Sequence, residues 1–219
     1  MEIILALDFD GTLYRLEEHD SEEMLFSVIA ETPEEIALKD KAISDLRAGG
    51  DPHEFEIVLR DMLIGKPLDA IERAIDMIMP LVDMEEMEIV RDIASRSDVH
   101  FHVVSCGTDM LVSEFLDRVG LSGYVEGIHA KELLHDDDTF IDFIWHVKGP
   151  EDKRKCVESL KTLHDGSYLV AMGDGFTDGP MLSAADKGFL IERPGSRHHD
   201  VDVEVISSFQ ELKDFVDSL

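Results

Sequence analysis

Five polar residues follow three short apolar segments of the chain, and their types suit phosphate chemistry. They are Asp8, Asp10, Ser105, Asp174 and Asp178. The apolar segments 2–7, 99–104 and 168–172 have the length and composition of buried strands. Because ligands of a parallel sheet bind at the carboxyl ends of its strands, we expect these side chains to converge at one edge. Crowded carboxylates repel one another unless a cation neutralises them, and such oxygen-rich sites suit Mg²⁺.

A carboxylate in such a site can itself accept a phosphoryl group. Transfer through a covalent acyl phosphate divides one difficult displacement into two easier ones. A serine hydroxyl, here that of Ser105, can donate a hydrogen bond to a phosphoryl oxygen. Glycines allow the backbone to approach a phosphate closely and to point N–H groups at it. Four glycines accompany the polar residues: Gly11, Gly107, Gly173 and Gly175.

The elements that must position these residues alternate between strand and helix over most of the chain. We expect strands at 2–8, 99–104, 124–129, 168–172 and 188–191, and helices at 110–119, 151–163, 179–185 and 209–219. Such alternation predicts an α/β fold with a doubly wound parallel sheet. Between the first two strands the apolar residues recur at helical spacing, which predicts a small inserted helical cap. The expected domains are a core of residues 1–15 plus 96–219 and a cap of residues 16–95.

These motifs resemble those of the haloacid dehalogenase (HAD) superfamily. The resemblance rests on the strand that leads into Asp-Phe-Asp-Gly-Thr-Leu at 8–13, on Ser105 after a later strand, and on Gly-Asp-Gly-Phe-Thr-Asp at 173–178. The motifs cover the chain in the order that the superfamily has them. An aspartate at position 10 is typical of its phosphatases, since the dehalogenase branch lacks this residue and the ATPase branch has lysine there.

The resemblance implies a role for each of these residues. Asp8 would be the nucleophile, and Asp10 would be the general acid that protonates the leaving oxygen and then the base that activates water. Ser105 and the N–H groups near Gly107 and Thr108 would hold the transferring phosphoryl group.

The resemblance also implies a Mg²⁺ cofactor. Asp8 and Asp174 would bind the metal with their carboxylates and Asp10 with its backbone carbonyl. Asp178 would be a further metal ligand, or it would contact and orient the other ligands without binding the metal itself.

The superfamily also requires a lysine near the start of the helix before the last motif. Three lysines compete for this role: Lys148, Lys153 and Lys155. We favour Lys153, because Val157 and Leu160 then form the buried face that should follow it on a helix. Lys148 stays open as a loop residue that could reach the site.

The helical insertion resembles the cap of the phosphoserine-phosphatase-like subgroup. Glu17 matches the position at which that subgroup binds the substrate amine. The arginine position that binds the substrate carboxylate is Met62 here, and Arg60 lies one helical step away. Glu17 and Arg60 are therefore the candidate substrate contacts, and Phe55 and Met62 are equally consistent with the core of the cap. The sequence leaves the substrate open among small phosphorylated metabolites.

Composition excludes several other classes of function. The formal net charge is −29, from 49 acidic and 20 basic residues. Such a surface repels nucleic acid and anionic membranes. The chain shows neither a signal-peptide pattern nor an apolar run long enough for a membrane helix. Two cysteines fifty positions apart, Cys106 and Cys156, are expected to be unpaired, which is typical of a reducing cytoplasm.

Two other functions stay open at this point. A phosphomutase or phosphotransferase acting on a small sugar phosphate would use the same residues. A non-catalytic anion-binding regulatory protein is expected to lose Asp8 or Asp10, and both are present. His198 and His199 follow a Pro-Gly-Ser turn, and we expect them in a solvated loop and not at a metal site.

Overall fold

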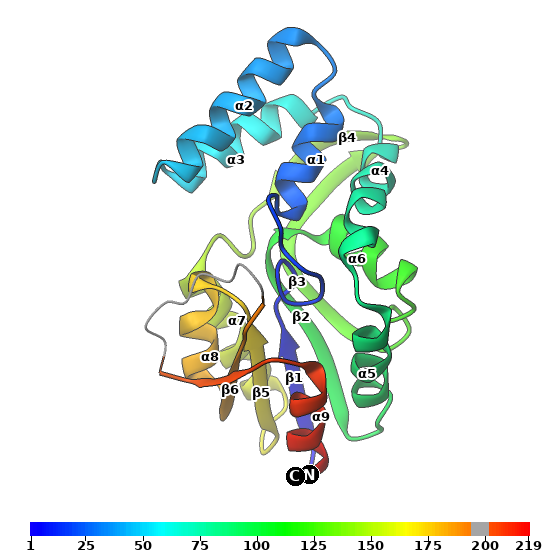
Figure 1. The fold of residues 1–219 in the computed structure, drawn as a ribbon, viewed down its shortest axis with the longest axis vertical. Helices are drawn as coiled ribbons and strands as arrows, with labels where there is room; N and C mark the ends of the chain where they lie inside the picture. The colour runs from blue at the N-terminus through cyan, green and yellow to red at the C-terminus, as the bar shows by residue number, and fades with distance from the viewer. Residues whose placement is uncertain (194–201) are drawn as a thin grey trace.

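The computed structural model describes residues 1–193 and 202–219 (Figure 1). Its centre is a mostly parallel sheet with the order β4-β3-β2-β1-β5-β6-β7 in the described part of the chain. The strands are β1 (Ile3–Leu7), β2 (Val99–Thr108), β3 (Val125–Asp136), β4 (Thr139–Ile144), β5 (Tyr168–Gly173), β6 (Lys187–Ile191) and β7 (Glu204–Ile206). The predicted doubly wound α/β fold is confirmed. The predicted loop with His198 and His199 lies outside the described residues.

Strand β1 lies at the centre of the sheet. It pairs in parallel with β2 on one side and β5 on the other, and all of its residues are buried. This explains its continuous apolar sequence, because a strand with helices on both faces has no solvent-facing side. Asp8 follows β1 directly, so the central strand delivers the first motif to the sheet edge.

Helices cover both faces of the sheet. The helices α5 (Met84–Ala94), α6 (Asp109–Arg118) and α9 (Phe209–Asp217) pack on one face, and α7 (Pro150–Leu163) and α8 (Gly179–Ala184) on the other. Successive side chains of β1 alternate between these layers. Leu5 belongs to the cluster that contains Phe115 and Leu212, whereas Ala6 packs with Val157. The motif-bearing edge of the sheet is therefore held in place by two buried clusters, one on each face.

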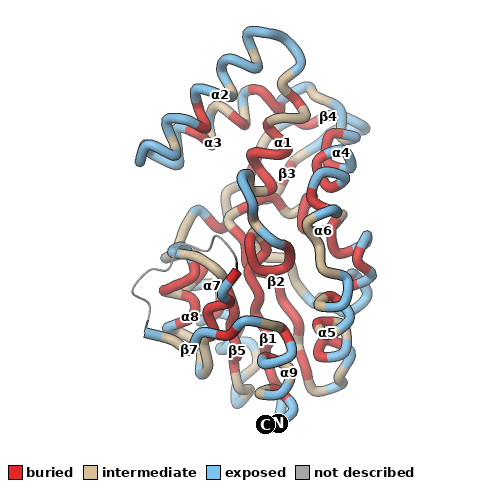
Figure 2. Tube along the Cα trace, viewed as in Figure 1, coloured by how far each residue is buried: buried red, intermediate tan, exposed pale blue. Residues whose placement is uncertain are grey.

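Four further helices stand between β1 and α5 and form a lid beyond the motif-bearing end of the sheet (Figures 1 and 2). They are α1 (Ser21–Ile29), α2 (Pro33–Arg47), α3 (Pro52–Leu63) and α4 (Asp69–Ile78). Local sequence explains where they start. Asp20 caps α1, Thr32 and Glu35 form a capping box on α2, and Asp51 caps α3. None of the described helices is both long and apolar enough to span a bilayer.

Helix α5 lies within the segment expected to belong to the cap, but it packs against β2 and α9. Its buried residues Met87, Val90 and Ile93 join the core cluster. We therefore propose that the lid comprises α1–α4 and ends near Ile78, and that α5 belongs to the core. This shortens the expected cap of residues 16–95 at its C-terminal end.

Strand β3 is longer than its prediction at 124–129, and it turns back as β4. Residues 136–138, which are all aspartates, form the tip of this antiparallel hairpin, where Asp137 has a φ of 47°. The hairpin contacts the loop between α3 and α4, since Gly65 N donates to Phe140 O at 2.8 Å. The sheet is thus extended into the lid, which the sequence pattern did not predict.

A buried ion cluster joins the hairpin to two lid helices. Lys131 of β3 is fully buried, and its Nζ lies 2.6 Å from Glu22 of α1 and also contacts Glu56 of α3. Burial acts to lower the pKa of Lys131, but the charges of Glu22 and Glu56 outweigh it and raise that pKa. The ammonium is therefore the common partner of two carboxylates that desolvation would otherwise disfavour.

Replacing Lys131 should destabilise the fold by leaving these carboxylates without their partner. We expect Lys131→Met, which keeps the aliphatic stem, to lower the free energy of unfolding by about 3–5 kcal/mol in urea titrations. The control is Lys41→Met, because the Lys41–Asp45 pair lies on the surface of α2 and should contribute far less to the free energy of unfolding. Equal losses in the two variants would contradict this interpretation.

Candidate active site

The structure brings together the carboxylates that were expected to meet at the sheet edge. Asp8 follows β1, Asp174 follows β5, and Asp178 ends the 3₁₀ turn Phe176–Asp178. One oxygen from each of these three residues lies within 4.8 Å of the others. The cause is the parallel pairing of β1 with β5, which ends both strands at the same level.

Lys153 is the cation within this cluster. Its Nζ lies 2.5 Å from Asp8 Oδ1 and 2.7 Å from Asp178 Oδ1, and its side chain is almost fully buried. It projects from the first turn of α7, where the helical periodicity placed it. Lys155 instead pairs with Asp152 at the surface, and Lys148 is exposed.

The cluster holds more negative than positive charge. Burial and the charge of Asp178 raise the pKa of Asp8 well above its usual range. The same two causes raise the pKa of Asp174 to about 7. Burial acts to lower the pKa of Lys153, but Asp178 and Asp8 outweigh it and raise that pKa, so the lysine stays charged. Buried carboxylate oxygens with this excess charge are the donors that fit Mg²⁺.

Asp178 uses both of its oxygens for contacts within the protein. Oδ1 accepts from Lys153, and Oδ2 accepts from the backbone N–H of Gly175 at 3.0 Å. Asp8 and Asp174 have more accessible oxygens by comparison, since Thr12 Oγ1 donates to Asp8 Oδ2 only at 3.4 Å. The arrangement therefore favours Asp8 and Asp174 as metal ligands, with Asp178 supporting the lysine and the turn.

Two glycines are required by the close packing of the carboxylates. A Cβ on Gly11, whose φ is 75°, would lie 2.2 Å from Asp174 Oδ2. A Cβ on Gly173 would lie 2.3 Å from the carboxyl carbon of Asp178. Any side chain at these positions would displace a carboxylate from the cluster.

Ser105, Gly107 and Asp10 lie next to one another. Ser105 Oγ accepts a hydrogen bond from Gly107 N at 2.9 Å. A Cβ on Gly107 would lie 3.2 Å from Ser105 Oγ and 3.4 Å from Asp10 Oδ2. Thr108 is fully buried, and its hydroxyl has no hydrogen-bond partner among the described residues. Gly107 thus keeps open the space between the serine hydroxyl and the second aspartate of the first motif.

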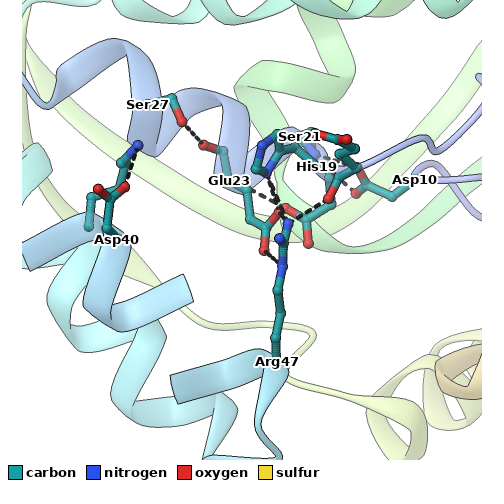
Figure 3. A network of polar contacts seen from close by, with 10 residues as sticks. Asp10, His19, Ser21, Glu23, Ser27, Asp40 and Arg47 are labelled. Atoms are coloured by element: carbon teal, nitrogen blue, oxygen red, sulfur yellow. Dashed lines mark hydrogen bonds and ion pairs between the residues drawn. The ribbon is translucent and has the colours of Figure 1, made fainter. Parts of the chain in front are cut away.

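Asp10 is held by the lid and by the loop that carries it. Its carboxylate accepts from Ser21 N at 2.7 Å, from Ser21 Oγ at 3.1 Å and from the hydroxyl of Tyr14 (Figure 3 shows the serine contacts). Burial and the charge of Asp10 raise the pKa of Tyr14, so its hydroxyl remains a donor. Ser21 is the first residue of α1, and therefore the orientation of Asp10 depends on the position of the lid.

The start of α1 is in turn fixed to α2. Arg47 Nη2 lies 2.7 Å from Glu23 Oε2, and His19 Nδ1 lies 2.8 Å from the same oxygen (Figure 3). Neither Tyr14 nor Ser21 was predicted from the sequence. The sequence did contain a signal for Ser21. Asp20 is a typical N-cap residue, which indicates that a helix starts at Ser21, shortly after the first motif.

A thiol lies between Ser105 and Gly107, but it is not poised for reaction. Burial raises the pKa of Cys106 to about 12. Burial therefore favours the protonated thiol near neutral pH over a thiolate. Both cysteines are unpaired, as expected.

The structure does not bring Glu17 and Arg60 to the carboxylate cluster. Glu17 is exposed and lines a surface groove together with Arg15 and residues 80–85. Arg60 Nε instead donates to Asp142 of β4 at 2.6 Å, and this hydrogen bond lowers the pKa of Asp142 to about 2. Arg60 thus fixes α3 to the hairpin, and spacing alone did not predict this partner.

Met62 and Phe55 belong to the core of the lid. Both are buried and join the cluster that also holds Phe26 of α1, whose ring packs edge-on against Phe55 at 5.6 Å between centroids. Phe55 and Met62 are therefore core residues of the lid. An apolar side chain, that of Met62, occupies the position at which the phosphoserine-phosphatase-like subgroup has its arginine.

The loop that carries Asp8 has a distant support that the sequence pattern did not indicate. Arg193 is buried, and its Nη2 donates to Thr12 O at 3.0 Å. Its Nη1 lies 2.7 Å from Glu86 of α5. These contacts join residues far apart in the chain, and no local spacing could reveal them.

Gly11 offers a direct test of the crowded site. We expect Gly11→Ala to weaken Mg²⁺ binding at least about tenfold, because the new methyl group displaces Asp174. The matched control is Gly65→Ala: Gly65 also has a positive φ, of 81°, but open space around its Cβ position. Both variants should lose about 1–2 kcal/mol of folding stability through backbone strain. Isothermal titration with Mg²⁺ and urea unfolding separate the two effects, and an equal loss of Mg²⁺ affinity would contradict the proposed crowding.

Solved structures share this fold at low sequence identity. A phosphoserine phosphatase in apo form matches with a TM-score of 0.69 and 19% identity, covering 98% of this chain and 99% of that one. A HAD family hydrolase from Salmonella enterica serovar Typhi matches with a TM-score of 0.70 and 18% identity, covering 94% of this chain and 68% of that one. These similarities establish the fold.

Sequence comparison establishes the family. A glucosyl-3-phosphoglycerate/mannosyl-3-phosphoglycerate phosphatase of Methanococcoides burtonii is 34% identical over 86 residues. That match covers 37% of this chain and only 30% of the relative. Residues 5–183 match the sequence profile described as haloacid dehalogenase-like hydrolase, and they include Asp8, Asp10, Ser105, Lys153 and Asp174. The chain therefore belongs to the haloacid dehalogenase-like hydrolase family.

Proposed function

We propose that this hydrolase is a Mg²⁺-dependent phosphomonoesterase that acts on a small phosphorylated metabolite through an aspartyl-phosphate intermediate on Asp8. The observation that carries the proposal is the buried Asp8 carboxylate, held 2.5 Å from Lys153 and close to Asp174 at the edge of the sheet. A carboxylate fixed beside a permanent cation is suited to approach a phosphate dianion, because part of the repulsion between the two anions is removed.

In the first step, a carboxylate oxygen of Asp8 forms a bond to phosphorus, and the bond between phosphorus and the ester oxygen breaks. Asp10 donates its proton to the leaving oxygen, which departs as an alcohol. Tyr14 and Ser21 orient the Asp10 carboxyl group for this transfer. Ser105 Oγ, which accepts a hydrogen bond from the Gly107 N–H, is the nearby hydroxyl donor that we assign to a phosphoryl oxygen.

In the second step, Asp10 removes a proton from water, and the water oxygen attacks the phosphorus of the acyl phosphate. The bond between phosphorus and Asp8 breaks, inorganic phosphate leaves, and the Asp8 carboxylate is restored. Asp10 ends the cycle protonated, ready for the next ester. Lys153 keeps its charge throughout and offsets the negative charge on Asp8.

The residues that would hold Mg²⁺ are Asp8 and Asp174 through their carboxylates and Asp10 through its backbone carbonyl. Bound Mg²⁺ would supply charge neutralisation for the phosphoryl group and the surrounding carboxylates. Asp178 supports this set by fixing Lys153 and the Gly175 N–H.

The lid points to small substrates. Because α1 contacts Asp10 through Ser21, closing the lid and orienting the general acid are coupled. The relatives described above are named as phosphatases of phosphoserine and of sugar-linked phosphoglycerates. We propose the same broad class, phosphate monoesters of small metabolites. The apolar Met62 and the engaged Arg60 provide no evident partner for the carboxylate of phosphoserine.

The proposal predicts chelator-sensitive phosphate release that requires Asp8. The assay is inorganic phosphate release from phosphoserine, phosphoglycerate esters, phosphocholine, sugar phosphates and an aryl phosphate, with Mg²⁺ and with EDTA. Asp8→Asn should lower kcat at least about 10³-fold, because an amide cannot form the acyl phosphate. Asp45→Asn, an exposed substitution on α2, is the control and should be as active as wild type.

Two outcomes would contradict the proposal. One is an Asp8→Asn variant that folds and keeps more than about a tenth of the wild-type kcat. The other is conversion of a sugar phosphate into its isomer without phosphate release, which would assign the chain to the phosphomutases.

A further inference from the structure

A second group of metal-ligating side chains lies at the opposite end of the sheet from the active site. His100 stands near the start of β2, Glu126 near the start of β3, and His164 directly after the end of α7. One ligand atom from each of these residues lies within 4.8 Å of the others. The residues come from three separate elements, so the fold and not a local turn brings them together.

The two imidazoles and the carboxylate are already in contact. His100 Nδ1 lies 2.8 Å from Glu126 Oε1, and the rings of His100 and His164 are 4.3 Å apart between centroids. His100 Nε2 faces Glu2 at 3.2 Å. A metal-binding histidine typically donates its other ring N–H to a carboxylate, and the pair His100 and Glu2 has this relation.

A second pair of histidines lies beside this group. His102 is buried, its Nδ1 lies 3.3 Å from His129 Nε2, and its ring centroid lies 6.0 Å from that of His164. His102 Nε2 is buried without a hydrogen-bond partner among the described residues.

Gly127 makes room for this arrangement. A Cβ at Gly127 would lie 2.9 Å from His102 Nδ1 and 3.0 Å from His129 Nε2. Strand β3, which pairs with β2, thus has a glycine at the point where the rings of His102 and His129 meet. His102 and Gly127 are separate from the His100 group, and the ring of His102 lies beside that of His164.

We propose that His100, Glu126 and His164 bind a transition-metal ion of the Zn²⁺ class at a second site, separate from the carboxylate cluster. Imidazole and carboxylate ligands suit Zn²⁺ and its neighbours, whereas Mg²⁺ prefers oxygen ligands alone. Ligand atoms around tetrahedral Zn²⁺ stand about 3.3 Å apart, as bonds of about 2.0–2.1 Å require. The ligand atoms now lie within 4.8 Å of one another, and small side-chain rotations would bring them to that distance.

The site would fix the far end of the helix that carries Lys153. His164 lies eleven positions after Lys153, which corresponds to roughly 16 Å along α7. A metal held by His100, Glu126 and His164 would join this end of α7 to β2 and β3, and its role would be structural. The proposal does not depend on the proposed phosphatase activity.

The experiment is a titration of the chelator-treated full chain with Zn²⁺, in excess Mg²⁺ to occupy the carboxylate cluster. Isothermal titration gives affinity and stoichiometry, and Co²⁺ absorption reports imidazole ligation. We expect one tight Zn²⁺ equivalent that His164→Gln and Glu126→Gln each weaken at least about 100-fold, and that Glu2→Gln weakens about tenfold.

Two controls use other histidines of the chain. His146→Gln removes an exposed imidazole that pairs only with Glu132 in the described structure, and it should leave Zn²⁺ affinity unchanged. The double variant His198→Gln/His199→Gln tests the imidazoles outside the described residues, and it should also bind as wild type does. Circular dichroism checks the fold, and Glu126 lies at the surface, so Glu126→Gln remains decisive if His164→Gln fails to fold.

Each result decides the proposal. Loss of the Zn²⁺ equivalent in the His164 and Glu126 variants, with both controls intact, supports it. It is overturned if the wild type binds no Zn²⁺ above the level of these variants, or if only the His198/His199 variant loses binding.

Discussion

The ion pairs of Lys153 with Asp8 and Asp178 are the interaction on which the rest of this structure depends. Isolated charges are costly to bury, and an ammonium with two carboxylates is tolerated only when geometry and hydrogen bonds are good. The geometry here requires the first turn of α7 to face the ends of β1 and β5. Gly11 and Gly173 leave room for the carboxylates of Asp174 and Asp178 in this space. Three carboxylates face one lysine here, and this excess of negative charge is consistent with the divalent cation proposed above.

The lid is bound to this centre by polar contacts and not by a flexible tether alone. Ser21, at the start of α1, contacts Asp10, and Lys131 of the hairpin holds α1 and α3 through buried carboxylates. Arg60 adds a third connection from α3 to β4. A movement of the lid must therefore change the surroundings of Asp10. This couples the orientation of a general acid to enclosure of the substrate, within the function proposed above.

The sequence predicted those parts that local pattern and topology determine. Asp8 follows an unbroken apolar strand, and strand ends of a parallel sheet meet at one edge; Lys153 follows from the periodicity of its helix. The hairpin was missed because the predicted strand ended early and its partner strand is short and interrupted by charge. Glu17 and Arg60 were assigned from the resemblance to the phosphoserine-phosphatase-like subgroup, which cannot reveal that Arg60 has a partner on β4 in this chain. The Lys131 cluster joins residues distant in sequence, so only the folded chain brings it together.

The most direct test of the account is to find the phosphoryl group on Asp8. An Asp10→Asn variant lacks the base for the second step, so the acyl phosphate should accumulate with an aryl phosphate, whose leaving group needs no proton. Rapid acid quench and peptide mass spectrometry would locate the group. The account predicts phosphorylation of Asp8 with Mg²⁺, none with EDTA, and none when Asp8→Asn is added. Aryl phosphate hydrolysis by this variant without any phosphorylated protein, or with the phosphoryl group on another residue, would contradict it.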